Sequence, residues 1–325
     1  MIKLKCPLKS VKFILNQYVN PRIEISFYNL IQINPVNTVY GIGRTLLASS
    51  TLITLLANSP DVLFPQTIQV VEAPVSPLVG MSLFNLLVDH LVIAKLLAII
   101  SLITVIIGIY PRYTGILHWY VAFSFFSACK VIDGGDHANS VLTLMIVPLT
   151  LLDNRKWHWK SPKQETNPPI LQNTIAWSFV MLIRVQVSII YLHAAVGKTG
   201  VKEWLDGTAV YYWFTHHYHG AAEWLKPIVV RTTSLPYIVT TISWGTIVLE
   251  FLLFACLFLS PKDPRRKIFL VLGIGFHLAI VLVHGLVSFY LVMCAALVLY
   301  LSNYSSAYIF LENKSLKTWI LSRLS

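Results

Sequence analysis

The chain has 325 residues, of which 56% are hydrophobic and only 12% are charged, with a mean hydropathy of +0.67. Soluble globular proteins carry about 25% charged residues, so this composition excludes a soluble enzyme, a disordered chain and a disulfide scaffold. The net charge of +11 would favour a nucleic-acid partner in a soluble protein, but in a membrane protein it must first be compared with the loop positions.

The N-terminal segment, residues 1–36, begins with a basic stretch at residues 3–12. No clean apolar stretch with a small-residue cleavage site follows it, which argues against a cleavable signal peptide. Pro21, Arg22 and Glu24 also interrupt the next part of the sequence. We therefore expect an amphipathic segment that lies on the cytoplasmic lipid surface.

Eight later stretches approach the roughly 20 mostly apolar residues that a membrane helix needs. They are residues 40–58, 90–110, 113–131, 137–152, 174–196, 236–259, 267–284 and 286–304. The fourth is short, the last two are typical of a helical hairpin around Gly285, and residues 78–87 are left unassigned. The sequence therefore predicts an all-α, polytopic membrane helical bundle of about eight transmembrane helices over residues 37–305, with a short cytoplasmic tail at 306–325.

The basic residues indicate the orientation of these spans. If the N-terminus is cytoplasmic, 18 of the 25 lysines and arginines lie on cytoplasmic segments. Two lie deep within spans, Lys95 and Arg184, and the other five are counted outside: Lys130, Lys198, Lys202, Lys226 and Arg231. Arg44, Lys130 and Lys267 lie near the ends of spans and are counted with the side that each adjoins. This bias follows the positive-inside rule and predicts a multi-pass membrane protein with both termini in the cytoplasm. It also argues against a nucleic-acid partner.

Three segments would then lie outside the membrane, at residues 59–89, 132–136 and 197–235. The first contains Pro65, Pro74 and Pro77, which argue against a continuous helix. The third is long for an idle connection and is rich in aromatic residues. Aromatic residues of this kind are typical of a membrane-interface belt, although they could also line a site for a lipid or peptide substrate.

Ionisable residues inside membrane spans are costly and usually face the bundle or a cavity. Arg184, Tyr191 and Lys198 are spaced seven residues apart and so share one face of a continuous helix. Arg184 could instead be a packing residue bonded to carbonyl groups or to Glu250. His277 and His284 share a face of the seventh span, where a lone histidine is more often a packing residue.

Lys198 lies where the fifth span meets the outside, after the small residues Ala194, Ala195, Val196 and Gly197. A lysine held against apolar walls can serve as a general base, although an interfacial lysine that reaches toward water is the simpler interpretation. The glycine-bent run at residues 132–137 places Asp136 and His137 at the outer end of the fourth span. Asp136 could also be an ordinary helix cap.

No metal site is predicted. His216, His217 and His219 form a cluster in the third outer segment, but adjacent histidines in a loop lack a fixed geometry. The sequence has no Gly-rich phosphate loop, HExxH or GxSxG motif, which weighs against ATPase, zincin and serine-hydrolase functions.

Four stretches resemble the HTTM membrane domain shared with the vitamin K-dependent gamma-carboxylases. They are GIYPRYT (108–114), DHANSVLTLMIVPLTLLDNRKWHW (136–159), RVQVSIIYLHAAVGKTGVKEWLDG (184–207) and FHLAIVLVHGLVSFYLVM (276–293). Within this family, the opening NTVYGIGRTLLASSTLITLLANSPDVLFP (37–65) most resembles the SdpB family of the bacterial sporulation-delaying-protein toxin system.

The resemblance implies that Lys198 matches the lysine that deprotonates vitamin K hydroquinone in the carboxylases. His137 matches a histidine that follows an Asn there, where this chain has Asp136, and His277 matches a histidine of the penultimate conserved helix. The carboxylases have two adjacent lysines and a large lumenal domain, whereas this chain has Gly197 before its lysine and only a short tail. Glutamate carboxylation is therefore not transferred.

The leading hypothesis is a membrane enzyme, or the membrane half of one, that matures a secreted antimicrobial peptide. Its base would be Lys198, with His137 as a hydrogen-bonding partner and Asp136, Arg184, Tyr191 and His277 in support. The partners would be membrane lipid, the toxin precursor peptide and a small SdpA-like protein. The cofactor is open, with menaquinol or another isoprenoid lipid as a candidate from the family alone. The alternative is a non-catalytic scaffold that docks the precursor and the small partner.

Overall fold

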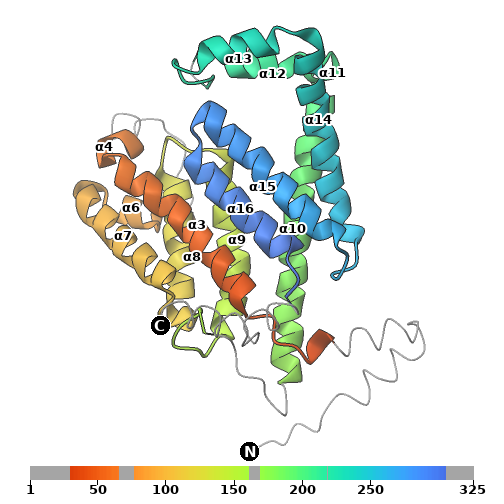
Figure 1. Cartoon of the computed structure of the whole chain (residues 1–325). Coiled ribbons are helices and arrows are strands. Elements are labelled where there is room, and N and C mark those ends of the chain that lie inside the picture. The colour runs from red at the N-terminus through yellow and green to blue at the C-terminus, as the bar shows by residue number, and fades with distance from the viewer. Residues whose placement is uncertain (1–29, 66–76, 161–168, 218, 305–325) are drawn as a thin grey trace, which may run out of the picture.

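The computed structural model describes residues 30–65, 77–160, 169–217 and 219–304, and within these ranges it contains helices and no strand (Figure 1). This confirms the all-α membrane bundle. Most of the predicted amphipathic N-terminal segment and the whole predicted tail lie outside the described residues.

Eight long helices form the bundle, and each falls on one of the eight predicted stretches. They are α3 (Thr38–Ala57), α7 (Leu91–Ile107), α8 (Pro111–Ala128), α9 (Gly134–Leu151), α10 (Ile170–Thr199), α14 (Pro236–Ala255), α15 (Arg265–His284) and α16 (Val287–Leu301). By length and composition, five helical stretches of the described residues could cross a membrane: Thr38–Ala57, Val88–Ile107, Ile170–Thr199, Pro236–Phe258 and Arg265–His284. The exact number of spans therefore stays a prediction.

The remaining elements are short and lie mostly in the two long outer segments. They are α4 (Pro60–Leu63), α5 (Pro77–Gly80), α6 (Leu83–Leu86), η2 (Val88–His90), α11 (Lys202–Leu205), α12 (Ala209–Thr215), α13 (Lys226–Thr233) and η3 (Cys256–Phe258). As the prolines predicted, the described part of residues 59–89 holds no long helix. The unassigned stretch at 78–87 falls on single-turn helices and does not form a further span.

Local sequence signals set several helix ends. The Asn37 side chain accepts a hydrogen bond from the Val39 amide at 2.9 Å and caps α3. Gly108 and Gly285 adopt positive φ values of 87° and 72° at the ends of α7 and α15, a conformation that glycine reaches without a steric penalty. Gly285 makes the turn of the predicted hairpin between α15 and α16.

The core is centred on α16 and α9, and side chains of α16 such as Leu297, Leu299 and Tyr300 are fully buried. Small residues allow the helices to approach closely, as in other membrane bundles. A Cβ atom at Gly43 of α3 would lie 2.6 Å from the Leu299 side chain, so α3 and α16 could not pack as they do with a larger residue. A second cluster of buried side chains joins α3 to α7 and α8.

The chain alternates between two ends of the bundle. At one end the Asn37 side chain donates to the Tyr304 carbonyl at 2.6 Å, so the first and last described segments meet there. Arg266 lies at the same end and donates to the Cys256 and Leu301 carbonyls. The opposite end carries α11, α12 and α13 (Figure 1). This alternation is what the predicted topology requires, and the charge asymmetry predicts that the second end faces outward.

Candidate functional site

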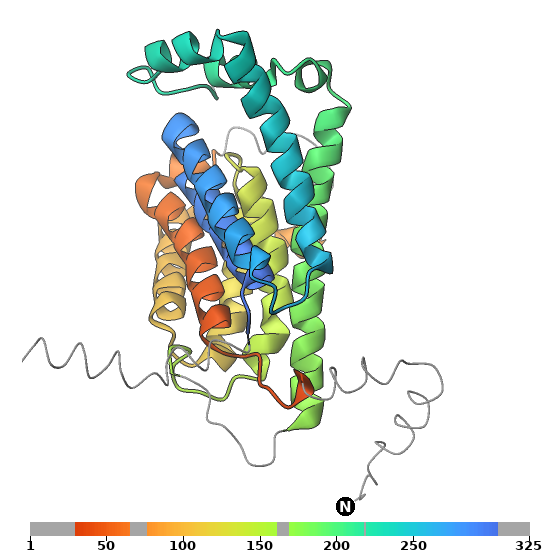
Figure 2. The same ribbon diagram turned by 45° about the vertical axis from the view of Figure 1, so that its right-hand side comes forward.

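Lys198 forms an ion pair with Glu250 where α10 and α14 run side by side (Figure 2). Its ammonium group lies 2.7 Å from Oε1 and 2.9 Å from Oε2 of the carboxylate, and it also donates to the Ala194 carbonyl at 3.4 Å. The lysine side chain is 21% exposed and the glutamate side chain 6%. The pair therefore holds two opposite charges at the edge of an apolar bundle, where each compensates the other.

Glu250 is the residue that the sequence did not assign to the site. It was considered only as a partner of Arg184, because nothing in the sequence sets which faces of α10 and α14 meet. The signal that could have identified it is a lone carboxylate within an apolar span, which by default marks a functional site. In the structure, the Glu250 carboxylate balances the positive charge of the Lys198 ammonium group.

Tyr191 lies two turns before Lys198 on the same face of α10, as the spacing predicted, and both Tyr191 and Arg184 are buried. The Tyr191 hydroxyl and Nε2 of His277 are 3.0 Å apart, and His277 comes from α15. The Nδ1 atom of His277 is buried and has no partner in the described part of the chain. Tyr191 and His277 thus form a polar pair inside the bundle, about two helical turns along α10 from the Lys198 ion pair.

Arg184 contacts a backbone carbonyl group and an aromatic ring that follow the end of α16. Its guanidinium donates to the Ser302 carbonyl at 3.1 Å and lies 5.4 Å from the centre of the Tyr304 ring. A cation next to the last carbonyl groups of α16 stabilises that helix end. Of the two interpretations, this geometry favours a packing residue bonded to carbonyl groups, and Glu250 pairs with Lys198 instead.

Asp136 and His137 lie at the start of α9. The predicted cap at Asp136 was placed three residues too late, because the N-cap is Asp133 and Asp136 makes the reciprocal bond of the capping box with the Asp133 amide at 3.0 Å. Asp136 is 6% exposed, and its Oδ1 atom has no partner within the described ranges. The exposed His137 ring stacks on Phe126, with centroids 5.0 Å apart.

The structure therefore brings Lys198 together with Glu250, and Tyr191 together with His277. Among the contacts of the described residues, none joins Lys198 to His137. The ring on which His137 stacks belongs to α8, whereas Lys198 pairs with α14.

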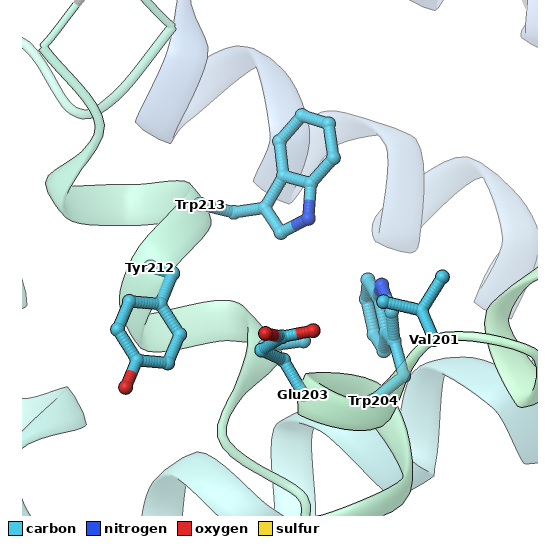
Figure 3. Close-up of a pocket in the computed structure, with 6 residues that line it drawn as sticks. Val201, Glu203, Trp204, Tyr212 and Trp213 are labelled. Carbon is cyan, nitrogen blue, oxygen red and sulfur yellow. The ribbon is translucent and has the colours of Figure 1, made fainter.

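The aromatic outer segment reaches the ion pair through Trp204. The Lys198 ammonium lies 5.2 Å from the centre of the Trp204 ring. An open pocket of about 210 Å³ is lined by residues of α11 and α12 and by the residue before α11: Val201, Glu203, Trp204, Ala209, Tyr212 and Trp213 (Figure 3). Tyr212 and Trp213 are more than half exposed, and the rings of His216 and His219 stack 5.2 Å apart next to this segment.

A quinol-type headgroup would fit these residues in chemical type. Trp204 offers an aromatic face for a flat ring, and the adjacent Lys198 offers a nitrogen base once it is neutral. The described residues include no group of three metal-binding side chains that could hold an ion.

Comparison with known proteins identifies the family. Residues 78–304 match the HTTM domain. The chain is 37% identical over 276 residues to Sporulation-delaying protein SdpB of Bacillus subtilis (strain 168), covering 82% of each protein. It is also 36% identical over 276 residues to Uncharacterized protein YitO of the same organism, covering 84% of this chain and 88% of that protein. No solved structure matches the chain. The chain belongs to the SdpB-like family of HTTM-domain membrane proteins.

Proposed function

We propose that this protein acts in the maturation of a secreted antimicrobial peptide, as a membrane enzyme or as the membrane half of one, with the Lys198–Glu250 pair as its base. The relative called Sporulation-delaying protein SdpB supports the toxin system as the setting. The observation that carries the catalytic part is the two-pronged ion pair, with its oxygens 2.7 and 2.9 Å from the lysine nitrogen, at the end of α10.

Glu250 could take up the proton that Lys198 must lose before it can act as a base. An ammonium group cannot accept a proton, so the lysine must first become neutral. Transfer of one proton from Nζ to the Glu250 carboxylate leaves a neutral amine next to a neutral carboxyl group, and the short distance allows this transfer. The amine then takes a proton from the substrate, which leaves a substrate anion beside the new ammonium cation. The charges balance at every step.

The other predicted residues have supporting roles in this proposal. The Tyr191–His277 hydrogen bond adds a polar pair between α10 and α15, two helical turns before Lys198 on α10, where a proton could be relayed. Asp136 and the exposed His137 lie at the start of α9, and their part would be to contact the peptide. The small partner protein and the precursor peptide would meet the aromatic outer segment. An isoprenoid quinol would supply redox chemistry if it binds.

The activity of the secreted peptide tests this proposal. We expect Lys198→Ala to abolish the antimicrobial activity of culture supernatants and Glu250→Gln to reduce it strongly, with the protein present in the membrane at the normal level. Lys202→Ala is the matched control, because Lys202 is an exposed lysine four residues further along the chain, at the start of α11. Full activity of the Lys198→Ala strain would refute the base assignment.

A non-catalytic scaffold is the second candidate function, and the exposed pocket of the outer segment is the observation that favours it. Such a scaffold would dock the precursor and the small partner without changing the peptide chemically. It would tolerate Lys198→Ala and would lose function when the residues around Tyr212 and Trp213 are replaced.

A further inference from the structure

The pocket on α11 and α12 combines three aromatic rings with one carboxylate. Figure 3 shows the Glu203 carboxylate between the rings of Tyr212 and Trp204, with the Trp213 indole above them. Glu203 is exposed, and it is absent from the four ion pairs formed among the described residues. The pocket therefore presents one carboxylate without a direct ion-pair partner among the described residues, next to aromatic faces.

The aromatic rings and the carboxylate of this pocket favour the binding of a cation. The face of an aromatic ring is negative and attracts an ammonium group such as that of lysine, and rings grouped together are the usual means of binding quaternary and methylated ammonium ligands. A nearby carboxylate adds direct charge attraction. A simple membrane-interface belt would account for the rings alone, whereas a bound cation would use both the rings and the carboxylate.

We propose that this pocket binds an alkylammonium group, and that in the cell the group is the ammonium of a lysine side chain in a secreted peptide. The binding of an ammonium group is inferred from the residues of the pocket. That this group belongs to a secreted peptide rests on the proposed function. The long α10, at about 45 Å, exceeds a hydrocarbon core of about 30 Å. In Figure 1, α11 and α12 lie beyond the outer ends of α15 and α16, where a peptide in solution can reach them.

The pocket shares a wall with the candidate base. Trp204 lines the pocket and also lies 5.2 Å from the Lys198 ammonium. A peptide anchored by its lysine in this pocket would therefore have neighbouring residues close to the Lys198–Glu250 pair. The pocket would act as an anchor for the substrate, and the ion pair would act as the reacting group.

Binding of two matched probes to the full-length protein tests the proposal. The protein is placed in nanodiscs of phosphatidylglycerol, which has no amine, and binding is followed by saturation-transfer NMR of the probe. We expect N-acetyl-lysine methylamide to bind at least about five-fold more tightly than its neutral analogue N-acetyl-norleucine methylamide. Glu203→Gln and Trp213→Ala should each weaken lysine binding by about five-fold. Trp224→Ala is the control, because Trp224 is 76% exposed and does not line the pocket.

Equal binding of the two probes, or unchanged binding after Glu203→Gln, would overturn the proposal. A second set of nanodiscs that contain phosphatidylethanolamine separates the two sources of an ammonium group. If this lipid displaces the lysine probe, the ligand in the cell is a lipid headgroup and the peptide source is wrong. Because no turnover is needed, a failure here is distinct from a failure of the Lys198 base.

Discussion

Replacing either partner of the Lys198–Glu250 pair is expected to destabilise the bundle, and replacing both is expected to cost less than the sum. Removing one partner of a buried ion pair costs about 3–5 kcal/mol, because the other charge stays buried without compensation. Lys198→Met leaves a carboxylate that is only 6% exposed, so we expect a loss of about 3 kcal/mol in the free energy of unfolding. Glu250→Gln leaves an ammonium group on a side chain that is 21% exposed and can turn toward water, so we expect about 1–2 kcal/mol.

The double variant Lys198→Met/Glu250→Gln carries no unpaired charge and should lose only about 1 kcal/mol, which gives a coupling energy of about 3–4 kcal/mol. The assay is unfolding in mixed micelles as the fraction of sodium dodecyl sulfate rises, followed by circular dichroism. The exposed pair Lys226–Glu223 is the matched control, with side chains 33% and 88% exposed and an expected coupling below about 0.5 kcal/mol. Additive effects of the Lys198 and Glu250 substitutions, within about 0.5 kcal/mol, would refute the reasoning.

Three further predictions follow from the packing, the loop chemistry and the topology. Gly115→Ala should destabilise the bundle by about 1–3 kcal/mol, because its Cβ would overlap the Thr150 side chain, whereas Gly245→Ala has open space and should be neutral or stabilising. Burial lowers the pKa of His158, in the loop after α9, to about 3. The unfolded chain then binds a proton at His158 below pH 6.5 that the folded chain does not. This residue should therefore lower the stability by about 2 kcal/mol from pH 6.5 to pH 5, and His158→Asn should remove that contribution in unfolding measurements. A cysteine at Lys202 should react with a membrane-impermeant maleimide in intact cells, and labelling only after lysis would reverse the predicted orientation.

The sequence predicted the helices well, because long apolar stretches and their flanking residues set where membrane helices lie. All eight predicted stretches correspond to long helices, and the turn at Gly285 was predicted from the same signals. The prolines of residues 59–89 also indicated correctly that the described part of this segment holds no long helix.

The partners within the site were harder to predict. The spans are apolar on nearly all sides, so periodicity does not set which faces of α10 and α14 meet. The pairing of Lys198 with Glu250 depends on that contact. Only Asp136 was considered as a cap of α9, and the hydrogen-bond geometry shows that Asp133 is the N-cap. In contrast, the shared face of Arg184, Tyr191 and Lys198 on α10 was predictable, because it depends only on the period of a single helix.

The intact mass of the secreted peptide tests the central claim most directly. It is measured for the peptide from cells that carry the wild-type protein, Lys198→Ala or Lys202→Ala. A catalytic base at Lys198 predicts that the peptide from Lys202→Ala cells has the wild-type mass, whereas the peptide from Lys198→Ala cells lacks a chemical change. Identical masses in all three strains would contradict catalysis by this protein.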